Sequence, residues 1–170
     1  MTELPASAAG VRLGTPADLD AIFALQQSAP ECAQWQRATY AEILTATPEA
    51  NPQRRVFCVQ RGGHVAGFAV ASLLRAAHTG VCELENMAVA PADRRLGVGR
   101  MLVAAVLTWS QQQRAESVHL EVRAANGAAV QLYERLGFVA VGRRPAYYSH
   151  PVDDAVQMTW MAGGGGALSC

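Results

Sequence analysis

Lysine is absent from this sequence: all fourteen of its basic residues are arginine. A chain without a lysine amine cannot form a Schiff base with a carbonyl substrate, anchor pyridoxal phosphate, or build a phosphate loop of the Gly-Lys-Ser type. The fourteen basic residues are matched by fourteen acidic ones, which gives a formal net charge of zero. Because binding to nucleic-acid phosphates needs a basic excess, we expect no direct contact with DNA or RNA.

Long hydrophobic runs are also missing. The longest uninterrupted run is 101–107, which is far shorter than the roughly 18 residues that a membrane-spanning helix needs. The first ten residues contain neither the basic region nor the apolar core of a signal peptide. We therefore expect a cytoplasmic protein with no membrane partner.

Cysteine and histidine are few and scattered. The four cysteines show no C-x-x-C spacing, and the four histidines show no spacing typical of metal ligands. The sequence therefore predicts no disulfide framework and no metal site. The residues concerned are Cys32, Cys58, Cys82, Cys170, His64, His78, His119 and His150.

The 170 residues, 51% of them hydrophobic, fit one globular domain. We place this domain at 11–162, between a flexible N-terminal segment, 1–10, and a flexible glycine-rich tail, 163–170. Hydrophobic periodicity and turn residues predict an initial strand followed by two helices, three strands, a helix, a strand, a helix and two strands. The expected helices are 16–28, 38–45, 98–113 and 127–136, and the later strands are 56–59, 65–74, 81–89, 118–122, 138–141 and 155–161. This order predicts a mixed α/β domain with a central mixed sheet of six to seven strands and about four flanking helices.

A glycine-containing basic segment lies between the strand that ends at Val89 and the helix that begins near Val98. It reads Arg94-Arg95-Leu96-Gly97-Val98-Gly99-Arg100. Glycine lets the backbone approach a ligand closely, and the first turn of a helix offers unpaired N–H groups at the positive end of its dipole. The pattern fits a pyrophosphate site, although it also fits an ordinary basic loop before a helix. A Rossmann site is disfavoured, because Leu102 replaces the third glycine and 90–96 separates the strand from the glycines.

The same segment resembles the pyrophosphate motif of the GNAT superfamily of acetyl-CoA-dependent N-acetyltransferases, Arg/Gln-x-x-Gly-x-Gly/Ala. Within that superfamily the chain is similar to the bacterial RimI-type branch, which acetylates the N-terminal alanine of a ribosomal protein. The resemblance is strong from about Glu83 to Met161 and loose before that. It rests on Asn86-Met87-Ala88-Val89, on 94–102, on 120–126 with 132–138, and on Arg144-Pro145-Ala146-Tyr147-Tyr148 followed by Asp154-Ala155.

The resemblance implies a set of acetyl-CoA contacts. Met87, Ala88 and Val89 would lie on a splayed strand whose backbone binds the pantetheine arm and polarises the thioester carbonyl. Arg94 begins the phosphate motif, and the main-chain N–H groups of 95–100 would hold the pyrophosphate. Asn126 would contact the cofactor beyond the thioester. One departure from the family pattern is Leu96, where many relatives carry a basic residue. Because main-chain groups form this site, the difference should change the affinity for the cofactor only modestly. The residues named for this cradle are Arg95, Leu96, Gly97, Val98, Gly99 and Arg100.

Two proton transfers are required, because the acceptor ammonium must lose a proton before attack and the departing thiolate gains from a positioned acid. Glu121 leaves the face of its strand that Leu120 and Val122 occupy, and Tyr133 lies on the next helix. The resemblance implies that Glu121 is the base and Tyr133 the acid. From the residues alone, a solvated glutamate and a packing tyrosine fit about equally well.

The acceptor side is less sharply marked. Glu83 and Glu85 share one strand face and could flank the amine, although alternating charge is also typical of a solvated strand. Tyr147 and Tyr148, expected in a proline-containing loop, could frame a peptide N-terminus or simply pack on the surface.

The sequence therefore predicts direct acetyl transfer from acetyl-CoA to a primary amine in a ternary complex, with the α-amine of an N-terminal alanine favoured as acceptor. A ribosomal protein is the partner that the resemblance implies. No cysteine lies in the site motifs to serve an acyl-enzyme route. One alternative is acetylation of a small amine such as a polyamine, an amino acid or an antibiotic. The other is a regulatory acyl-CoA-binding domain without turnover, against which Glu121 and Tyr133 argue.

Overall fold

The computed structural model describes residues 10–77 and 79–163. The flexible ends predicted at 1–10 and 163–170 therefore lie outside the described residues, except for Gly10 and Gly163. The described chain has the predicted order of elements. Its strands are β1 (Val11–Leu13), β2 (Gln53–Arg61), β3 (His64–Ala76), β4 (Thr79–Val89), β5 (Ala115–Arg123), β6 (Val139–Ser149) and β7 (Val152–Met161), and its helices are α1 (Leu19–Gln27), α2 (Arg37–Thr45), α3 (Val98–Gln112) and α4 (Gly127–Arg135).

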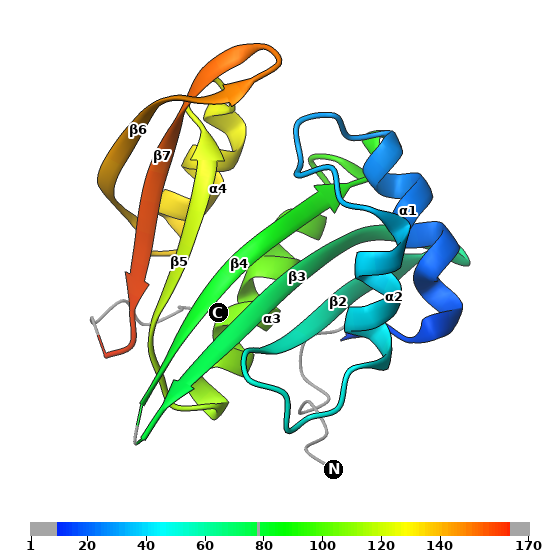
Figure 1. Ribbon diagram of the computed structural model, residues 1–170. Helices are drawn as coiled ribbons and strands as arrows, with labels where there is room; N and C mark the ends of the chain where they lie inside the picture. Colours follow the sequence, from blue (N-terminus) through cyan, green and yellow to red (C-terminus); the bar gives the residue numbers. More distant parts are fainter. Residues whose placement is uncertain (1–9, 78, 164–170) are drawn as a thin grey trace.

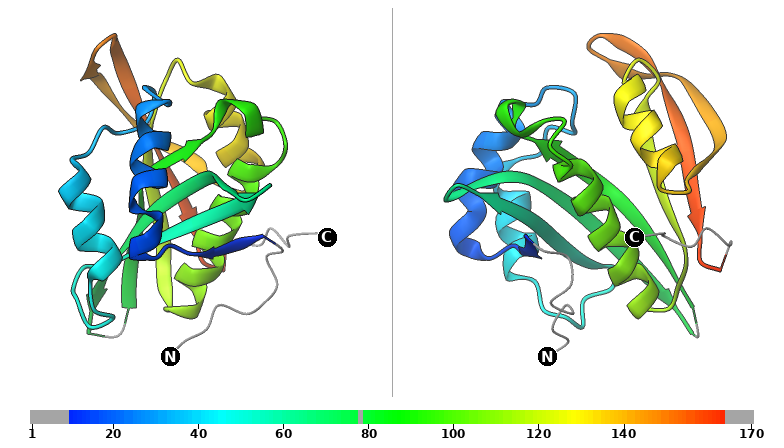
Figure 2. Two further views of the ribbon diagram at one scale, coloured as in Figure 1. Left: turned by 90° about the vertical axis from the view of Figure 1, so that its right-hand side faces the viewer. Right: turned by 180° about the vertical axis from the view of Figure 1, so that it is seen from behind.

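The seven strands form one sheet in the order β1-β2-β3-β4-β5-β7-β6. Neighbouring strands are antiparallel except for the parallel pair β4 and β5. α1 and α2 pack on one face of β2, β3 and β4, and α3 packs on the opposite face (Figures 1 and 2). The fold is therefore the predicted mixed α/β domain, with a sheet of seven strands.

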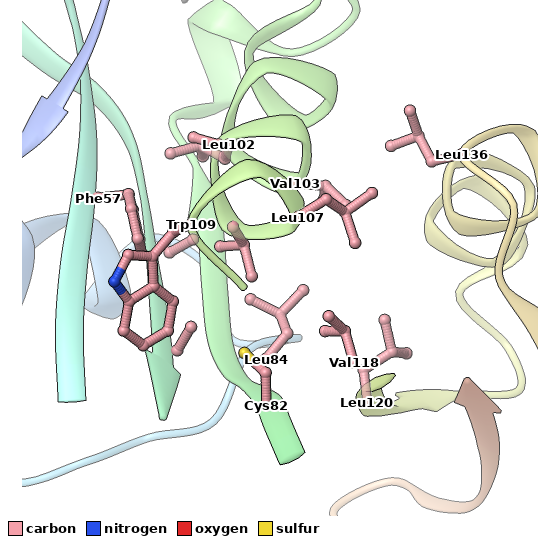
Figure 3. Packing of buried hydrophobic residues seen from close by; sticks show 14 of the residues in the cluster. Phe57, Cys82, Leu84, Leu102, Val103, Leu107, Trp109, Val118, Leu120 and Leu136 are labelled. Carbon is pink, nitrogen blue, oxygen red and sulfur yellow. The ribbon is translucent and has the colours of Figure 1, made fainter. Parts of the chain in front are cut away.

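The larger hydrophobic core lies between α3 and the sheet. Apolar residues at helical spacing give α3 one buried face that includes Leu102, Val106 and Trp109. The Trp109 ring packs edge-on against Phe57 of β2 at a centroid distance of 5.8 Å, as Figure 3 shows. Burying each such side chain contributes about 1.5–3 kcal/mol, so α3 is fixed firmly and its first turn has a defined place at the end of β4.

β4 and β5 separate after only a short stretch of pairing. Their register runs from Gly80 and Ala115 to Glu83 and His119, and beyond this point the two strands diverge (Figure 1). In the same region β4 contains a bulge, because Leu84 pairs with Ala71 while Asn86 pairs with Val70. Glu85 is the extra residue, and bulges of this kind bend a strand and change which residues face the core. The divergence and the bulge together open the sheet beside the start of α3.

The C-terminal hairpin is longer than the sequence predicted. Strands were expected at 138–141 and 155–161, whereas β6 continues to Ser149 and β7 begins at Val152. Pro145 does not end β6, because the register between Arg144 and Tyr148 is interrupted at this point and a proline in an edge-strand bulge breaks no ladder hydrogen bond. Tyr147 and Tyr148 therefore lie within a bulged strand and not in a loop.

No helix in the described ranges is long and apolar enough to cross a membrane. Within 10–77 and 79–163, no cluster of three or more histidine, cysteine or acidic side chains could hold a metal ion. Cys32, Cys58 and Cys82 are free thiols.

Candidate active site

A cleft of about 710 Å³ opens where β4 and β5 diverge. Its walls come from the second half of β4, the end of β5, the loop before α3, the first turn of α3 and one side of α4. Three predicted site residues, Glu83, Leu96 and Tyr147, do not line it. The predicted residues that the structure brings together in this cleft are Glu85, Met87, Ala88, Val89, Arg94, Arg95, Gly97, Val98, Gly99, Arg100, Glu121, Asn126, Tyr133 and Tyr148.

One end of the cleft is formed by backbone N–H groups at the start of α3. The first helical hydrogen bond of this turn runs from the N–H of Met101 to the carbonyl of Gly97, so the N–H groups of 98–100 have no partner within the helix. Gly97 caps the helix with a φ of 83°, a left-handed conformation that glycine adopts without strain. Unpaired N–H groups at the positive end of a helix dipole are well suited to a phosphate.

Side chains anchor this loop to the rest of the protein. Arg94 donates from Nε to the carbonyl of Val89 at 3.3 Å, and its guanidinium also pairs with Glu31. The neighbouring carboxylate of Asp93 is buried and lies 2.8 Å from Nε2 of His64. Leu96 is exposed and lies outside the cleft. The anchors thus hold the loop in place beside the cleft, and the Leu96 side chain takes no part in its lining.

Glu121 faces away from the core because side chains alternate along β5, where Leu120 and Val122 are buried. Its Oε1 lies 2.9 Å from Nε of Arg144 and accepts a hydrogen bond of 3.1 Å from Nε2 of Gln157. The carboxylate is therefore held from β6 and from β7 at the wall of the cleft.

Tyr133 reaches the same cleft from α4. Its side chain is buried, and the ring packs edge-on against Phe138 at a centroid distance of 5.6 Å. Burial raises the pKa of the Tyr133 phenol, and the nearby Tyr148 raises it further. The hydroxyl consequently keeps its proton at neutral pH and can donate it.

Asn126 occupies the N-terminal cap of α4. Its side-chain oxygen accepts a hydrogen bond of 3.2 Å from the N–H of Ala129, which satisfies one of the free donors of the helix. The cap uses only the oxygen of the amide and fixes its orientation at the cleft wall. Asn126 therefore begins α4 and also shapes the cleft.

The two glutamates of β4 have different surroundings. Glu85 receives two hydrogen bonds of 2.9 Å from the guanidinium of Arg54, so its charge is already paired. For Glu83, burial raises the pKa of the carboxyl first, and the negative charges of Glu85 and Glu121 raise it further. The charge of Glu121 on β5 therefore acts on Glu83, which lies at the last position where β4 pairs with β5.

The two tyrosines of β6 form a perpendicular pair beside Glu121. Their ring centroids are 5.1 Å apart, and the guanidinium of Arg123 lies 4.1 Å above the ring of Tyr148. Tyr147 is half exposed, and the negative charge of Glu121 is the main cause that raises the pKa of its phenol. The bulge of β6 thus places the rings of Tyr147 and Tyr148 beside Glu121, the candidate base.

Sequence reasoning missed the segment between α1 and α2. Glu31, Cys32 and Ala33 line the cleft, and the carbonyl of Ala33 accepts a hydrogen bond of 2.9 Å from Nδ2 of Asn86. Burial raises the pKa of Cys32 to about 12, so this thiol stays protonated and is a poor nucleophile. The segment contains no recognisable motif and meets β4 only through the fold, so it could not be predicted from local sequence patterns.

Comparison with known proteins agrees with this geometry. Residues 19–138 match the acetyltransferase (GNAT) family. The chain is 32% identical to the ribosomal protein bS18-alanine N-acetyltransferase of Escherichia coli K12 over 133 residues, which cover 77% of this chain and 81% of that protein. It is 35% identical to the N-alpha-acetyltransferase RimI of Mycobacterium tuberculosis over 109 residues, which cover 64% of this chain and 67% of that protein. The crystal structure of the Escherichia coli ribosomal-protein-S18-alanine N-acetyltransferase superimposes with a TM-score of 0.72 and 26% identity, covering 94% of this chain and 97% of that one. With a cleft of this construction and a family match over most of its length, the chain belongs to the GNAT family of acetyltransferases.

Proposed function

We propose that this protein transfers the acetyl group of acetyl-CoA to the α-amine of a protein N-terminus, with alanine as the first residue and a ribosomal protein as the acceptor. The observation that carries the proposal is the meeting of Glu121 from β5 and Tyr133 from α4 in one cleft that ends at the free N–H groups of α3. The names of the relatives from Escherichia coli and Mycobacterium tuberculosis support the choice of a protein N-terminus.

The residues at the start of α3 fit acetyl-CoA. A Cβ atom at Gly99 would lie 3.1 Å from Cδ2 of Leu132, so any larger side chain would crowd the narrow space between α3 and α4. The N–H groups of 98–100 would hold the pyrophosphate, and the unpaired edge of β4 at Met87 and Val89 would hold the pantetheine arm. Acetyl-CoA supplies the activated acetyl group as a thioester.

Glu121 and Tyr133 would carry the two proton transfers. Glu121 is ion-paired and only partly exposed, and as a carboxylate it would accept the proton that the acceptor ammonium must lose. Tyr133 is buried and protonated, and its hydroxyl would donate to the leaving thiolate. The acceptor amine could then attack directly, since Cys32, the cysteine that lines the cleft within the described ranges, is held as a neutral thiol.

The acceptor would enter along the face that carries Glu83 and Tyr147. Glu85 is paired with Arg54, which leaves Glu83 as the β4 carboxylate that could attract a basic residue following the N-terminal alanine. Tyr147 and Tyr148 would frame the first peptide units from the other side. This arrangement favours a peptide that begins Ala-Arg over an isolated lysine side chain or a small amine.

The test uses acetyl-CoA with a panel of peptides and small amines, followed by mass spectrometry of the products. We expect a peptide that begins Ala-Arg to be acetylated on its α-amine, and we expect a peptide with a blocked α-amine to give no product. Acetyl groups found on internal lysines, or only on free small amines, would overturn the N-terminal assignment. Binding of acetyl-CoA without turnover on any amine would overturn the catalytic proposal.

A further inference from the structure

One arginine contacts both the candidate base, Glu121, and the tyrosine wall, which is the ring pair of Tyr147 and Tyr148. Nε of Arg144 lies 2.9 Å from Oε1 of Glu121, and the guanidinium carbon of Arg144 lies 5.5 Å from the centroid of the Tyr147 ring. Gln157 binds the same carboxylate oxygen from β7. Arg144 from β6 and Gln157 from β7 therefore reach the same oxygen of this carboxylate. Arg144 thus links the candidate base to Tyr147.

The charges around Glu121 make this contact important. Its negative charge acts on Glu83 of β4 and on Tyr147 and Tyr148 of β6, and none of these three groups is cationic. Its β7 neighbour, Gln157, is uncharged. Among the described residues, Arg144 is the cation that forms an ion pair with this carboxylate, whereas Arg123 lies over the ring of Tyr148. An opposite charge within about 4–6 Å favours the ionised form of a carboxylate, whereas a like charge disfavours it.

The bulge of β6 gives Arg144 this position. Arg144 is the last residue of β6 that pairs with β7 before the interruption, and its partner is Ala155. The bulge is braced by Asp154, whose carboxylate accepts hydrogen bonds of 2.9 Å from the N–H of Ala146 and 2.6 Å from Nε of Arg143. Arg144 thus projects from the rigid end of the ladder, whereas Tyr147 belongs to the bulge itself.

We propose that Arg144 is a positioning residue that holds the Glu121 carboxylate at the wall of the cleft and couples this base to the tyrosine wall. The inference rests on the proposed function, since it assigns the support of the base in that same site. It makes the guanidinium a requirement for proton removal and not for the binding of acetyl-CoA.

The kinetic test compares Arg144→Gln, Arg144→Lys and a matched control, Arg37→Gln, which removes an arginine from an ion pair with Asp20 on α1. For the Ala-Arg peptide we expect Arg144→Gln to lower kcat roughly tenfold, a fraction of the 10²–10⁴-fold contribution of a general base. The acidic limb of the kcat/KM profile should move to higher pH, because Glu121 would then face Glu83 without its cation. Arg144→Lys should restore most of both losses, and the KM for acetyl-CoA should stay constant.

A second readout does not depend on activity. The positive charge of Arg144 lowers the pKa of the Tyr147 phenol, against the raising effect of Glu121. In ¹³C-tyrosine NMR, the pKa of Tyr147 should therefore rise in Arg144→Gln and return toward the original value in Arg144→Lys. Arg37→Gln should leave it unchanged.

The outcomes separate this inference from the proposed function. Wild-type acetylation of the peptide, together with an Arg144→Gln variant whose kcat and acidic limb match those of Arg37→Gln, would overturn the role of Arg144 and leave the function standing. An inactive wild type in which Tyr147 still responds to Arg144→Gln would overturn the proposed acceptor and retain the coupling of Arg144 to the wall. An unchanged Tyr147 titration would overturn that coupling.

Discussion

The substitution Gly99→Val should weaken the binding of acetyl-CoA while it leaves the stability of the fold nearly unchanged. A Cβ atom at this position would lie 3.1 Å from Cδ2 of Leu132, 3.9 Å from Cγ2 of Val89 and 4.0 Å from Cε of Met87. The single carbon of alanine is accommodated if Leu132 moves by a few tenths of an ångström. The two further methyl groups of valine would have to occupy the space among α3, α4 and β4, next to the N–H groups of 98–100. We therefore expect Gly99→Val to raise the Kd for acetyl-CoA at least tenfold, which corresponds to about 1.4 kcal/mol.

The fold itself should change little. Glycine in a helix is about 0.5–1 kcal/mol less favourable than alanine, so added side chains offset part of the crowding at Gly99. Isothermal titration calorimetry measures the affinity, and circular dichroism with thermal melting checks the fold. Gly127→Val is the matched control, because it makes the same change at the start of α4, where the added Cβ meets nothing within 4 Å beyond its chain neighbours and the backbone of its own helix. Wild-type affinity in a folded Gly99→Val variant would refute the assignment of this end of the cleft to the pyrophosphate.

Three further predictions concern catalysis, the acceptor and pH. Glu121→Gln and Tyr133→Phe should each lower kcat by roughly 10²-fold or more, with little change in acetyl-CoA affinity. Glu121→Gln should also flatten the acidic limb of the pH–rate profile. Near-wild-type turnover in both variants would place the proton transfers on other residues. Tyr147→Ala should chiefly raise the KM for the peptide, and a selective rise in the KM for acetyl-CoA would contradict the placement of this residue at the acceptor. Ion pairing with Arg12 lowers the pKa of Asp18 from 3.8 to about 2; stability from this pair is therefore present above pH 4 and lost as the pH falls toward 2. After allowance for the partial exposure of Arg12, Asp18→Asn should lower the free energy of unfolding by about 1 kcal/mol at pH 7 and by much less near pH 2, as measured by urea denaturation.

Most elements of the fold could be predicted from sequence patterns within a few neighbouring residues. The apolar face of α3, the turn between β2 and β3 and the glycine that ends α4 are encoded within a few residues, and each element was predicted in its place. β6 was the main error, because Pro145 has the same local signature in a loop and in an edge-strand bulge. Only the pairing with β7 distinguishes the two, and pairing is a long-range property.

The candidate site likewise has a part that local motifs predict and a part that depends on long-range contacts. Gly97 and Gly99 could be predicted as candidate site residues because the chemistry of a helix N-terminus is local, and the structure places both at the cleft. The partners of the charged residues were not identified: the pairs Arg54 with Glu85, Arg94 with Glu31 and Arg144 with Glu121 join residues that are 31, 63 and 23 positions apart. A sequence shows that Glu85 carries a charge, but only the folded chain shows that an arginine already neutralises it.

The early separation of β4 and β5 has a consequence for how freely this site can vary during evolution. A β-sheet that stops pairing in its interior leaves two rows of amide and carbonyl groups whose positions depend on the strands and not on their side chains. An extended ligand with amide groups of its own can then form hydrogen bonds with these groups, as a further strand would. Recognition of this kind tolerates substitution at most positions, since every residue except proline presents the same backbone. It concentrates the sequence requirements of the site on the few positions where space, as at Gly99, or charge, as at Glu121, cannot be supplied by the main chain.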